Sequence, residues 1–191
     1  MPGYLIRFGE AAQRTIRLGL SPPEFVATTG RILTPETLGR LANALGALDP
    51  HEVVAQCVSV HLRAQTVFEQ VLRVPVTYTI GHVFIPPHYR FHQSEEDLAA
   101  LLANPAMKKE VRLHTWLTLP TMEIADLVIL TSLAVINGRQ TGMGGVISRH
   151  ADELADELEY VPMILGAEYL YRIGAVSSSQ LAAPAGRLRQ A

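Results

Sequence analysis

The chain lacks a second cysteine, a strong net charge and a long apolar run. Its 191 residues include one cysteine, so no disulfide can form within the chain. Basic and acidic residues nearly balance, 16 against 18, which leaves no field that attracts phosphates or anionic lipid. The longest apolar run, 127–136, contains Thr131 and Ser132 and is shorter than the roughly 20 residues that cross a bilayer. We therefore expect no nucleic-acid partner and no membrane partner.

No segment combines a basic start, an apolar stretch and a small-residue cleavage site, so we expect a cytoplasmic protein with a reduced thiol. With 48% apolar and 18% charged residues, the chain can bury a core of its own. No internal repeat and no low-complexity tract divides it. We predict a single globular domain over residues 1–176 and a flexible C-terminal tail over 177–191.

The hydrophobic pattern alternates between helical and extended segments. Apolar residues recur at intervals of three and four over 50–72, after the capping residue Asp49, and predict the main helix. Residues 74–85 are rich in β-branched and aromatic side chains and predict a strand that ends at Pro86 and Pro87. The further predicted elements are a short strand over 1–8, short helices from Ser21 and from Thr34, a helix over 94–103, strands over 111–119 and 122–130, a glycine-rich loop over 137–145, and helices near 148–158 and 163–173. The order predicts an α+β fold, with helices packed on an antiparallel sheet.

The predicted hairpin around Pro120 places two polar residues across from each other. If the strands turn at that proline, His114 lies opposite Asp126, and directly opposed side chains share a face with their Cβ atoms about 5 Å apart. At that distance a carboxylate accepts a hydrogen bond from an imidazole and stabilises its cationic form. Glu123 lies opposite Leu117 in this register and is the poorer, alternative acid. A shift by one residue would turn Asp126 to the other face.

The one thiol, Cys57, is the candidate nucleophile. A thiolate attacks more readily than a thiol, and a neighbouring imidazolium stabilises that anion. A Cys on a core helix, a following strand, then His114, Thr115 and Trp116 on the next strand and Asp126 on the one after resembles the papain-like, transglutaminase-like cysteine superfamily, over about residues 50–130.

The resemblance implies a transglutaminase-like (papain-like) α+β core and a Cys57, His114 and Asp126 triad. Cys57 would attack an amide or ester carbonyl, His114 would move the proton and Asp126 would orient His114. In that family the cysteine stands at the N-terminus of its helix. Here Asp49 lies eight residues earlier, so either the helix starts later than this cap indicates or Cys57 lies inside it as a buried, inert thiol.

Two functions follow from these residues. The first is a cysteine-dependent amide hydrolase or acyl transferase that forms an acyl-enzyme on a peptide, protein or small acyl substrate. The alternative is a non-catalytic protein-binding or immunity module on the same fold, with a partner protein as its ligand. We expect no cofactor and no metal ion, because His82, His88 and His92 follow no zinc-binding spacing. Trp116 is a supporting residue in the first interpretation and a packed core aromatic in the second.

Overall fold

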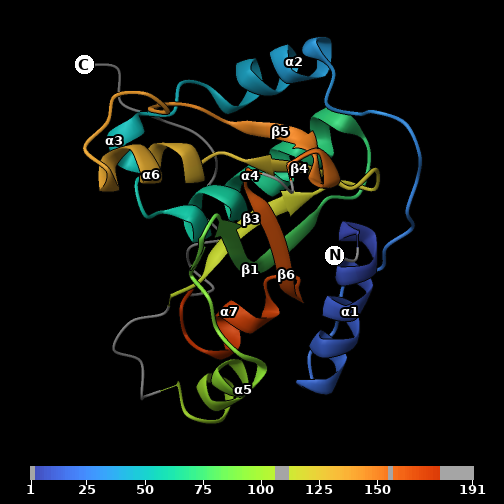
Figure 1. Cartoon of the computed structure of the whole chain (residues 1–191). Helices are drawn as coiled ribbons and strands as arrows, with labels where there is room; N and C mark the ends of the chain where they lie inside the picture. The colour runs from blue at the N-terminus through green and yellow to red at the C-terminus, as the bar shows by residue number, and fades with distance from the viewer. Residues whose placement is uncertain (1–2, 106–111, 155–156, 177–191) are drawn as a thin grey trace.

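The computed structural model describes residues 3–105, 112–154 and 157–176 (Figure 1). The described helices are α1 (Tyr4–Arg17), α2 (Pro35–Leu45), α3 (Pro50–Val53), α4 (Cys57–Leu72), α5 (Glu95–Ala103), α6 (Ile129–Ile136), the short 3-10 helix Ala151–Glu153, and α7 (Glu168–Arg172). The described strands are β1 (Thr77–Ile85), β2 (His88–Arg90), β3 (His114–Thr118), β4 (Glu123–Asp126), β5 (Ile147–His150) and β6 (Glu159–Leu165). The fold is mixed α+β, as the sequence predicted.

All strands pair antiparallel in one curled sheet around β1. Residues 77–81 of β1 pair with β3 and residues 83–85 pair with β2, while β6 pairs with residues 79–84. Because β6 overlaps both, β2 and β3 share one edge of β1 and β6 occupies the other. From β3 the sheet continues through β4 to β5, which is its open end.

Gly81 lets two elements approach β1 at the point where the pairing with β6 shifts register. A Cβ atom at this position would collide with the carbonyl oxygen of Val161 and would lie 2.7 Å from the Trp116 ring. Glycine is therefore required here by the close approach of another backbone. Beside this position, Tyr160 of β6 packs against the ring of Trp116, with ring centroids 4.9 Å apart.

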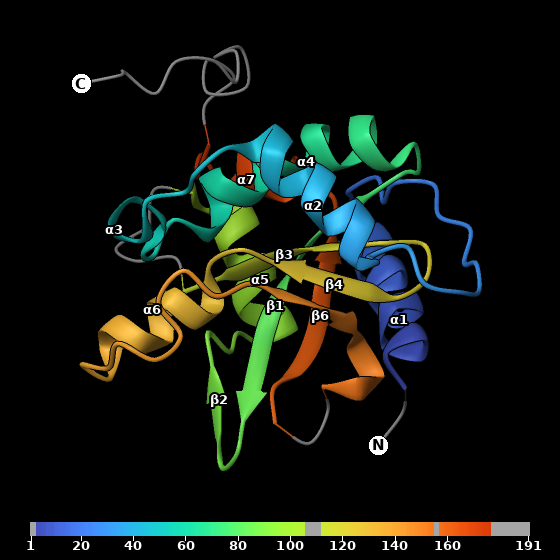
Figure 2. The ribbon, with the colours of Figure 1, turned by 90° about the horizontal axis from the view of Figure 1, so that it is seen from above.

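Helices cover both faces of the sheet and bury two apolar clusters (Figure 2). On one face α2 and α4 lie together over β1 and β3, where Val60, Phe68 and Leu117 are buried. On the other face α1 packs along β6, and its residues Tyr4 and Phe8 share a cluster with Trp116 and other core residues.

The predicted helix over 50–72 is two helices. α3 ends at Val53, Ala55 adopts a left-handed backbone with φ of 56°, and α4 begins at Cys57. The Ala55 N–H donates to the hydroxyl of Ser132 at 3.2 Å, so a contact from α6 holds the break open. Asp49 does cap a helix, because it accepts from the His51 N–H at 2.8 Å, but that helix is the short α3.

Of four helices and strands predicted in the first 103 residues, two are wrong and two are confirmed. Residues 1–8 were predicted as a strand, but Tyr4 begins α1, and buried residues at intervals of three and four give its helical face. No helix begins at Ser21, whose N–H donates instead to Glu168 at 2.9 Å. The helix from Thr34 is confirmed as α2, and the helix over 94–103 is confirmed as α5.

The second half of the chain departs further from prediction. The strand predicted over 122–130 ends at Asp126, and α6 begins at Ile129. The prediction of a helix near 148–158 is wrong, because its described residues hold the end of β5 and the short 3-10 helix Ala151–Glu153. The helix predicted near 163–173 is confirmed in part as α7, but residues 163–165 belong to β6, which pairs with β1 about 80 residues earlier in the chain. The loop over 137–145 is confirmed. Residue 111 and the tail predicted over 177–191 lie outside the described residues.

Candidate active site

Cys57 is the first residue of α4, at the N-terminus of a 16-residue helix. The two residues before it, Ala55 and Gln56, are exposed, whereas Cys57 itself is 9% exposed. The N-cap residue Gln56 makes no side-chain capping hydrogen bond, and among the described residues no side chain bonds the first-turn backbone N–H groups beside the thiol. The sulfur lies 3.7 Å from the carbonyl oxygen of Leu113, and its S–H donates to that oxygen. This contact joins the helix N-terminus to the residue directly before β3.

His114 begins β3 and Asp126 ends β4, and the structure brings their side chains together. The strands pair Leu117 with Ala125 and Thr118 with Ile124, which shifts the register by two residues from the predicted one. A shift of two keeps every side chain on its face, so the two residues still meet, diagonally instead of directly opposite. The His114 Nε2 atom lies 2.6 Å from Asp126 Oδ2.

The carboxylate of Asp126 is fully buried and accepts four hydrogen bonds. Oδ2 accepts from the His114 ring and from the hydroxyl of Tyr160 at 2.9 Å. Oδ1 accepts from the backbone N–H groups of Val128 and Ile129, at 2.9 and 3.0 Å, where the chain enters α6. A buried carboxylate with all of its acceptor positions used holds its orientation, so the imidazole that it bonds is held as well.

The pair of His114 and Asp126 is stabilised in its charged form. Burial by itself would lower the pKa of His114, but the charge and hydrogen bond of Asp126, together with the neighbouring Cys57, raise that pKa to about 10. Burial would raise the pKa of Asp126, and the charge and hydrogen bond of His114 instead hold it well below its ordinary value. At neutral pH the site therefore holds an imidazolium and a carboxylate side by side.

His61, one turn after Cys57 on α4, is a neutral structural neighbour of this pair. Burial lowers the pKa of His61 to about 4, against the opposing charge of Asp126. Its Nε2 accepts from the Leu127 N–H at 2.9 Å, which leaves the proton on Nδ1. His61 thus fixes the backbone directly after Asp126.

Aromatic rings enclose the imidazole of His114. Phe91 stacks on it with ring centroids 5.3 Å apart, and Trp116 lies 5.9 Å away on the same strand. The Trp116 N–H donates to the Tyr4 hydroxyl at 2.8 Å, and its ring packs edge-on against Tyr160. Trp116 is fully buried, so it supports the site from inside the core and has no surface for a substrate.

Glu123, the alternative acid, lies elsewhere. Its carboxylate accepts from the backbone N–H groups of Ile32 and Leu33, at 2.6 and 3.1 Å, and from the Thr121 hydroxyl at 2.6 Å. It is three residues from Asp126 on β4 and so points to the opposite face of the sheet. Glu123 holds the segment before α2 and takes no part in the His114 environment.

The sequence did not identify Tyr160 and Phe91 as neighbours of the site. Tyr160 belongs to β6 and lies in the gap between the helices predicted near 148–158 and 163–173, and it reaches Asp126 only through the pairing of β6 with β1. Phe91 follows β2 and adopts a left-handed backbone with φ of 62°. Neither residue stands at a spacing from His114 that a local pattern could reveal.

Within residues 3–105, 112–154 and 157–176, no three or more His, Cys, Asp or Glu side chains are grouped to hold a metal ion. In the same part of the chain, none of the helices combines the length and hydrophobicity that crossing a bilayer requires. Comparisons with protein-family models, with curated proteins and with solved structures find no match for this chain. The site geometry is therefore the basis for any functional assignment.

Proposed function

We propose that the chain is a cysteine-dependent amide hydrolase or acyl transferase with a papain-like, transglutaminase-like core. The observation that supports the proposal is the position of Cys57 at the start of α4, beside an imidazole that is hydrogen-bonded to a buried carboxylate at 2.6 Å. A helix N-terminus and an imidazolium both favour a thiolate. Since Asp126 occupies Nε2 of His114, Nδ1 is the nitrogen left to exchange a proton with the sulfur.

The reaction would proceed through a thioester on Cys57. The thiolate attacks the carbonyl carbon of an amide or ester, and the negative oxygen that forms is stabilised by backbone N–H groups at the first turn of α4. As the bond to the leaving amine or alcohol breaks, His114 gives that group its proton. Water or an acceptor amine then attacks the thioester, His114 takes up its proton, and the thiolate leaves. Asp126 stays ionised throughout and orients the imidazole.

The single thiol makes the proposal directly testable. Iodoacetamide labelling of the native protein reports only on Cys57, and we expect rapid labelling at pH 6, where an ordinary cysteine is almost entirely protonated. His114→Ala should slow labelling at pH 6 about a hundredfold and leave the rate at pH 10 nearly unchanged. His51→Ala, which removes an exposed histidine of α3, is the matched control.

Chemistry is tested with p-nitrophenyl acetate as the acyl donor. Intact-protein mass spectrometry should find one acetyl group on the wild type and none on Cys57→Ser. Labelling that occurs only after unfolding, or acetylation that persists in Cys57→Ser, would contradict the proposal.

The low exposure of Cys57 and the hydrogen bond of its sulfur to the Leu113 carbonyl favour a second function, a non-catalytic module that binds a partner protein on the same fold. In that case the buried thiol only donates a hydrogen bond to the Leu113 carbonyl, and His114 and Asp126 form a structural ion pair. Native Cys57 would then resist iodoacetamide at every pH up to unfolding. Partner binding would also be unchanged in Cys57→Ser, which distinguishes this function from the first.

A further inference from the structure

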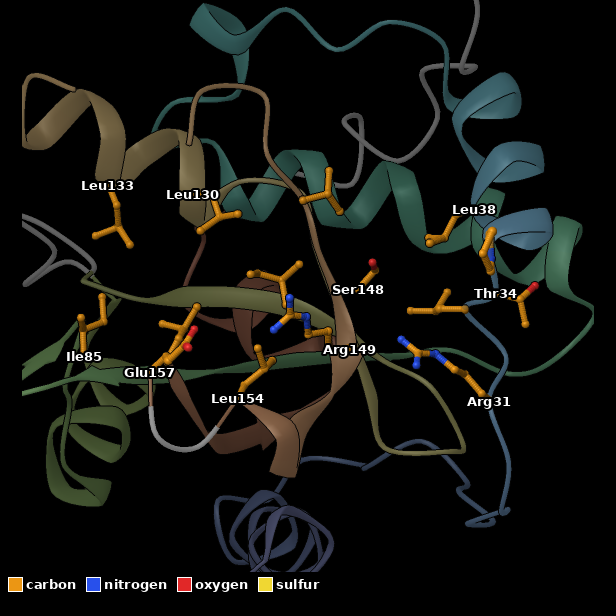
Figure 3. Close-up of a pocket in the computed structure, with 15 residues that line it drawn as sticks. Arg31, Thr34, Leu38, Ile85, Leu130, Leu133, Ser148, Arg149, Leu154 and Glu157 are labelled. Atoms are coloured by element: carbon orange, nitrogen blue, oxygen red, sulfur yellow. The ribbon is translucent and has the colours of Figure 1, made fainter. Parts of the chain in front are cut away.

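A pocket of about 770 Å³ surrounds β5, the strand at the open end of the sheet (Figure 3). One of its walls contains Leu33 and Leu38, from the apolar cluster under α2 and α4. The opposite wall contains Leu130 and Leu154, from the cluster on the other face of the sheet. A pocket lined from both faces and by β5 itself has to pass around the outer edge of that strand. We call it the β5 groove.

The outer edge of β5 offers backbone groups to the groove. The Ala151 N–H donates to the carbonyl of Met122, the residue before β4, at 3.0 Å, so Arg149, two residues earlier, also points its backbone groups at β4. Ser148 and His150 therefore direct their N–H and C=O groups away from the sheet. In the part of the chain that the structure describes, no hydrogen bond occupies these groups.

The two walls fit the side chains of an added strand. Successive side chains of a strand point to opposite faces, so a strand along β5 would place alternate residues against the Leu33 and Leu38 wall and the Leu130 and Leu154 wall. Both walls are mainly apolar, which matches a segment with apolar side chains on both faces. Main-chain hydrogen bonds to Ser148 would set the register.

The charges in the groove favour an acidic ligand. Arg149 is exposed and has no ion pair among the described residues. Arg31, on the opposite wall, is about half exposed and forms an ion pair with the buried Glu123, whose carboxylate lies 3.7 Å from the Arg31 Nε atom. Among the described residues that line the groove, Glu157 is the acidic one. Arg31 is paired with Glu123, so Arg149 is the arginine of the groove whose charge a ligand carboxylate would neutralise.

We propose that the β5 groove binds an extended segment of a partner protein by strand addition. The segment has apolar side chains at alternate positions and at least one aspartate or glutamate that meets Arg149. This binding site is separate from the thiol chemistry and does not depend on it. We expect the groove to bind the segment whether Cys57 is reactive or inert.

The test is selection of a phage-displayed library of random heptapeptides on the whole chain, followed by fluorescence anisotropy with the enriched peptides. Ser148→Pro removes an outward N–H without touching the ladder to β4, and should weaken binding about tenfold. Arg149→Glu should weaken binding by at least tenfold. The matched controls, Ser148→Ala and the strand arginine variant Arg90→Glu, should bind as the wild type does.

Several results would overturn the proposal: no enrichment above background, enriched peptides without a carboxylate, or peptides that bind Arg149→Glu as tightly as the wild type. A dimer in light scattering that Ser148→Pro dissociates would show that a second copy of the chain occupies the edge instead. Circular dichroism of each variant checks its folding. If Ser148→Pro does not fold, the comparison of Arg149→Glu with Arg90→Glu decides the question alone.

Discussion

Replacing Asp126 with asparagine should remove most of the stability that the buried ion pair contributes, and the size of the loss should depend on pH. Asparagine keeps an oxygen for the N–H groups of Val128 and Ile129, but its NH₂ group would face two donors, the His114 ring and the Tyr160 hydroxyl. Breaking a buried pair from one side costs about 3–5 kcal/mol. We expect a loss of that size at pH 6.

The pH dependence follows from the raised pKa of His114. That pKa is about 10 in the folded chain against an ordinary 6.5, so the folded state keeps its proton where the unfolded state has lost it. The resulting stability is fully present below pH 6.5 and declines as pH rises toward 10. Between pH 6 and pH 9 the wild type should lose about 3 kcal/mol relative to Asp126→Asn. Because the pKa of Asp126 is lowered, the wild-type advantage persists on the acid side down to about pH 4.

Urea unfolding, followed by tryptophan fluorescence, measures this difference. Trp116 is the single tryptophan, is fully buried and lies next to His114, so its emission reports on the site itself. Asp49→Asn, at the cap of α3, is the matched control and should unfold at a constant offset from the wild type above pH 5. A stability difference between wild type and Asp126→Asn that stays constant from pH 6 to pH 9 would refute the assignment of a charged pair.

Three further variants test the packing around the site. Gly81→Ala should lower the free energy of unfolding by more than about 3 kcal/mol, because the new methyl group meets a backbone carbonyl of β6, and a urea midpoint close to that of the wild type would disprove this. Glu123→Gln should cost about 1–3 kcal/mol by placing an NH₂ group toward backbone donors, yet leave the rate of Cys57 labelling unchanged, which separates this carboxylate from the site. Tyr160→Phe removes one hydrogen bond from Asp126 and should lower the free energy of unfolding in urea by about 1–2 kcal/mol. It should also reduce the rate of Cys57 labelling. An unaltered unfolding midpoint would mean that this hydroxyl does not contribute to stability.

Local patterns in the sequence were enough to predict that His114 and Asp126 lie close together. The alternation of the two strands around Pro120 is a short-range signal, and a register error of two residues left both side chains on the same face. The strength of the hydrogen bond between His114 and Asp126 could not be predicted from local patterns. It depends on Tyr160 and on the Val128 and Ile129 N–H groups, and these reach Asp126 through β6 and the start of α6.

The position of Cys57 at the start of α4 could not be predicted from local sequence patterns. Helical periodicity runs without a break from Pro50 to Leu72, and the run 53–56 before Cys57 contains no helix breaker. The interruption at Ala55 is held by a hydrogen bond to Ser132, 77 residues later in the chain. A left-handed alanine costs of the order of 1 kcal/mol, which local propensity would avoid and a tertiary contact can offset.

That interruption matters because it decides what the thiol can do. In a continuous helix Cys57 would have a full turn of hydrogen-bonded backbone before it, and no free N–H group would lie beside the sulfur. With the break, the same residue stands at the positive end of a 16-residue helix, next to an imidazole that a buried carboxylate holds. The hydroxyl of Ser132 is therefore a determinant of the site, although it lies on α6 and touches neither the sulfur nor the ring. A residue of this kind is invisible to any reading of motifs, because its effect is on where a helix begins.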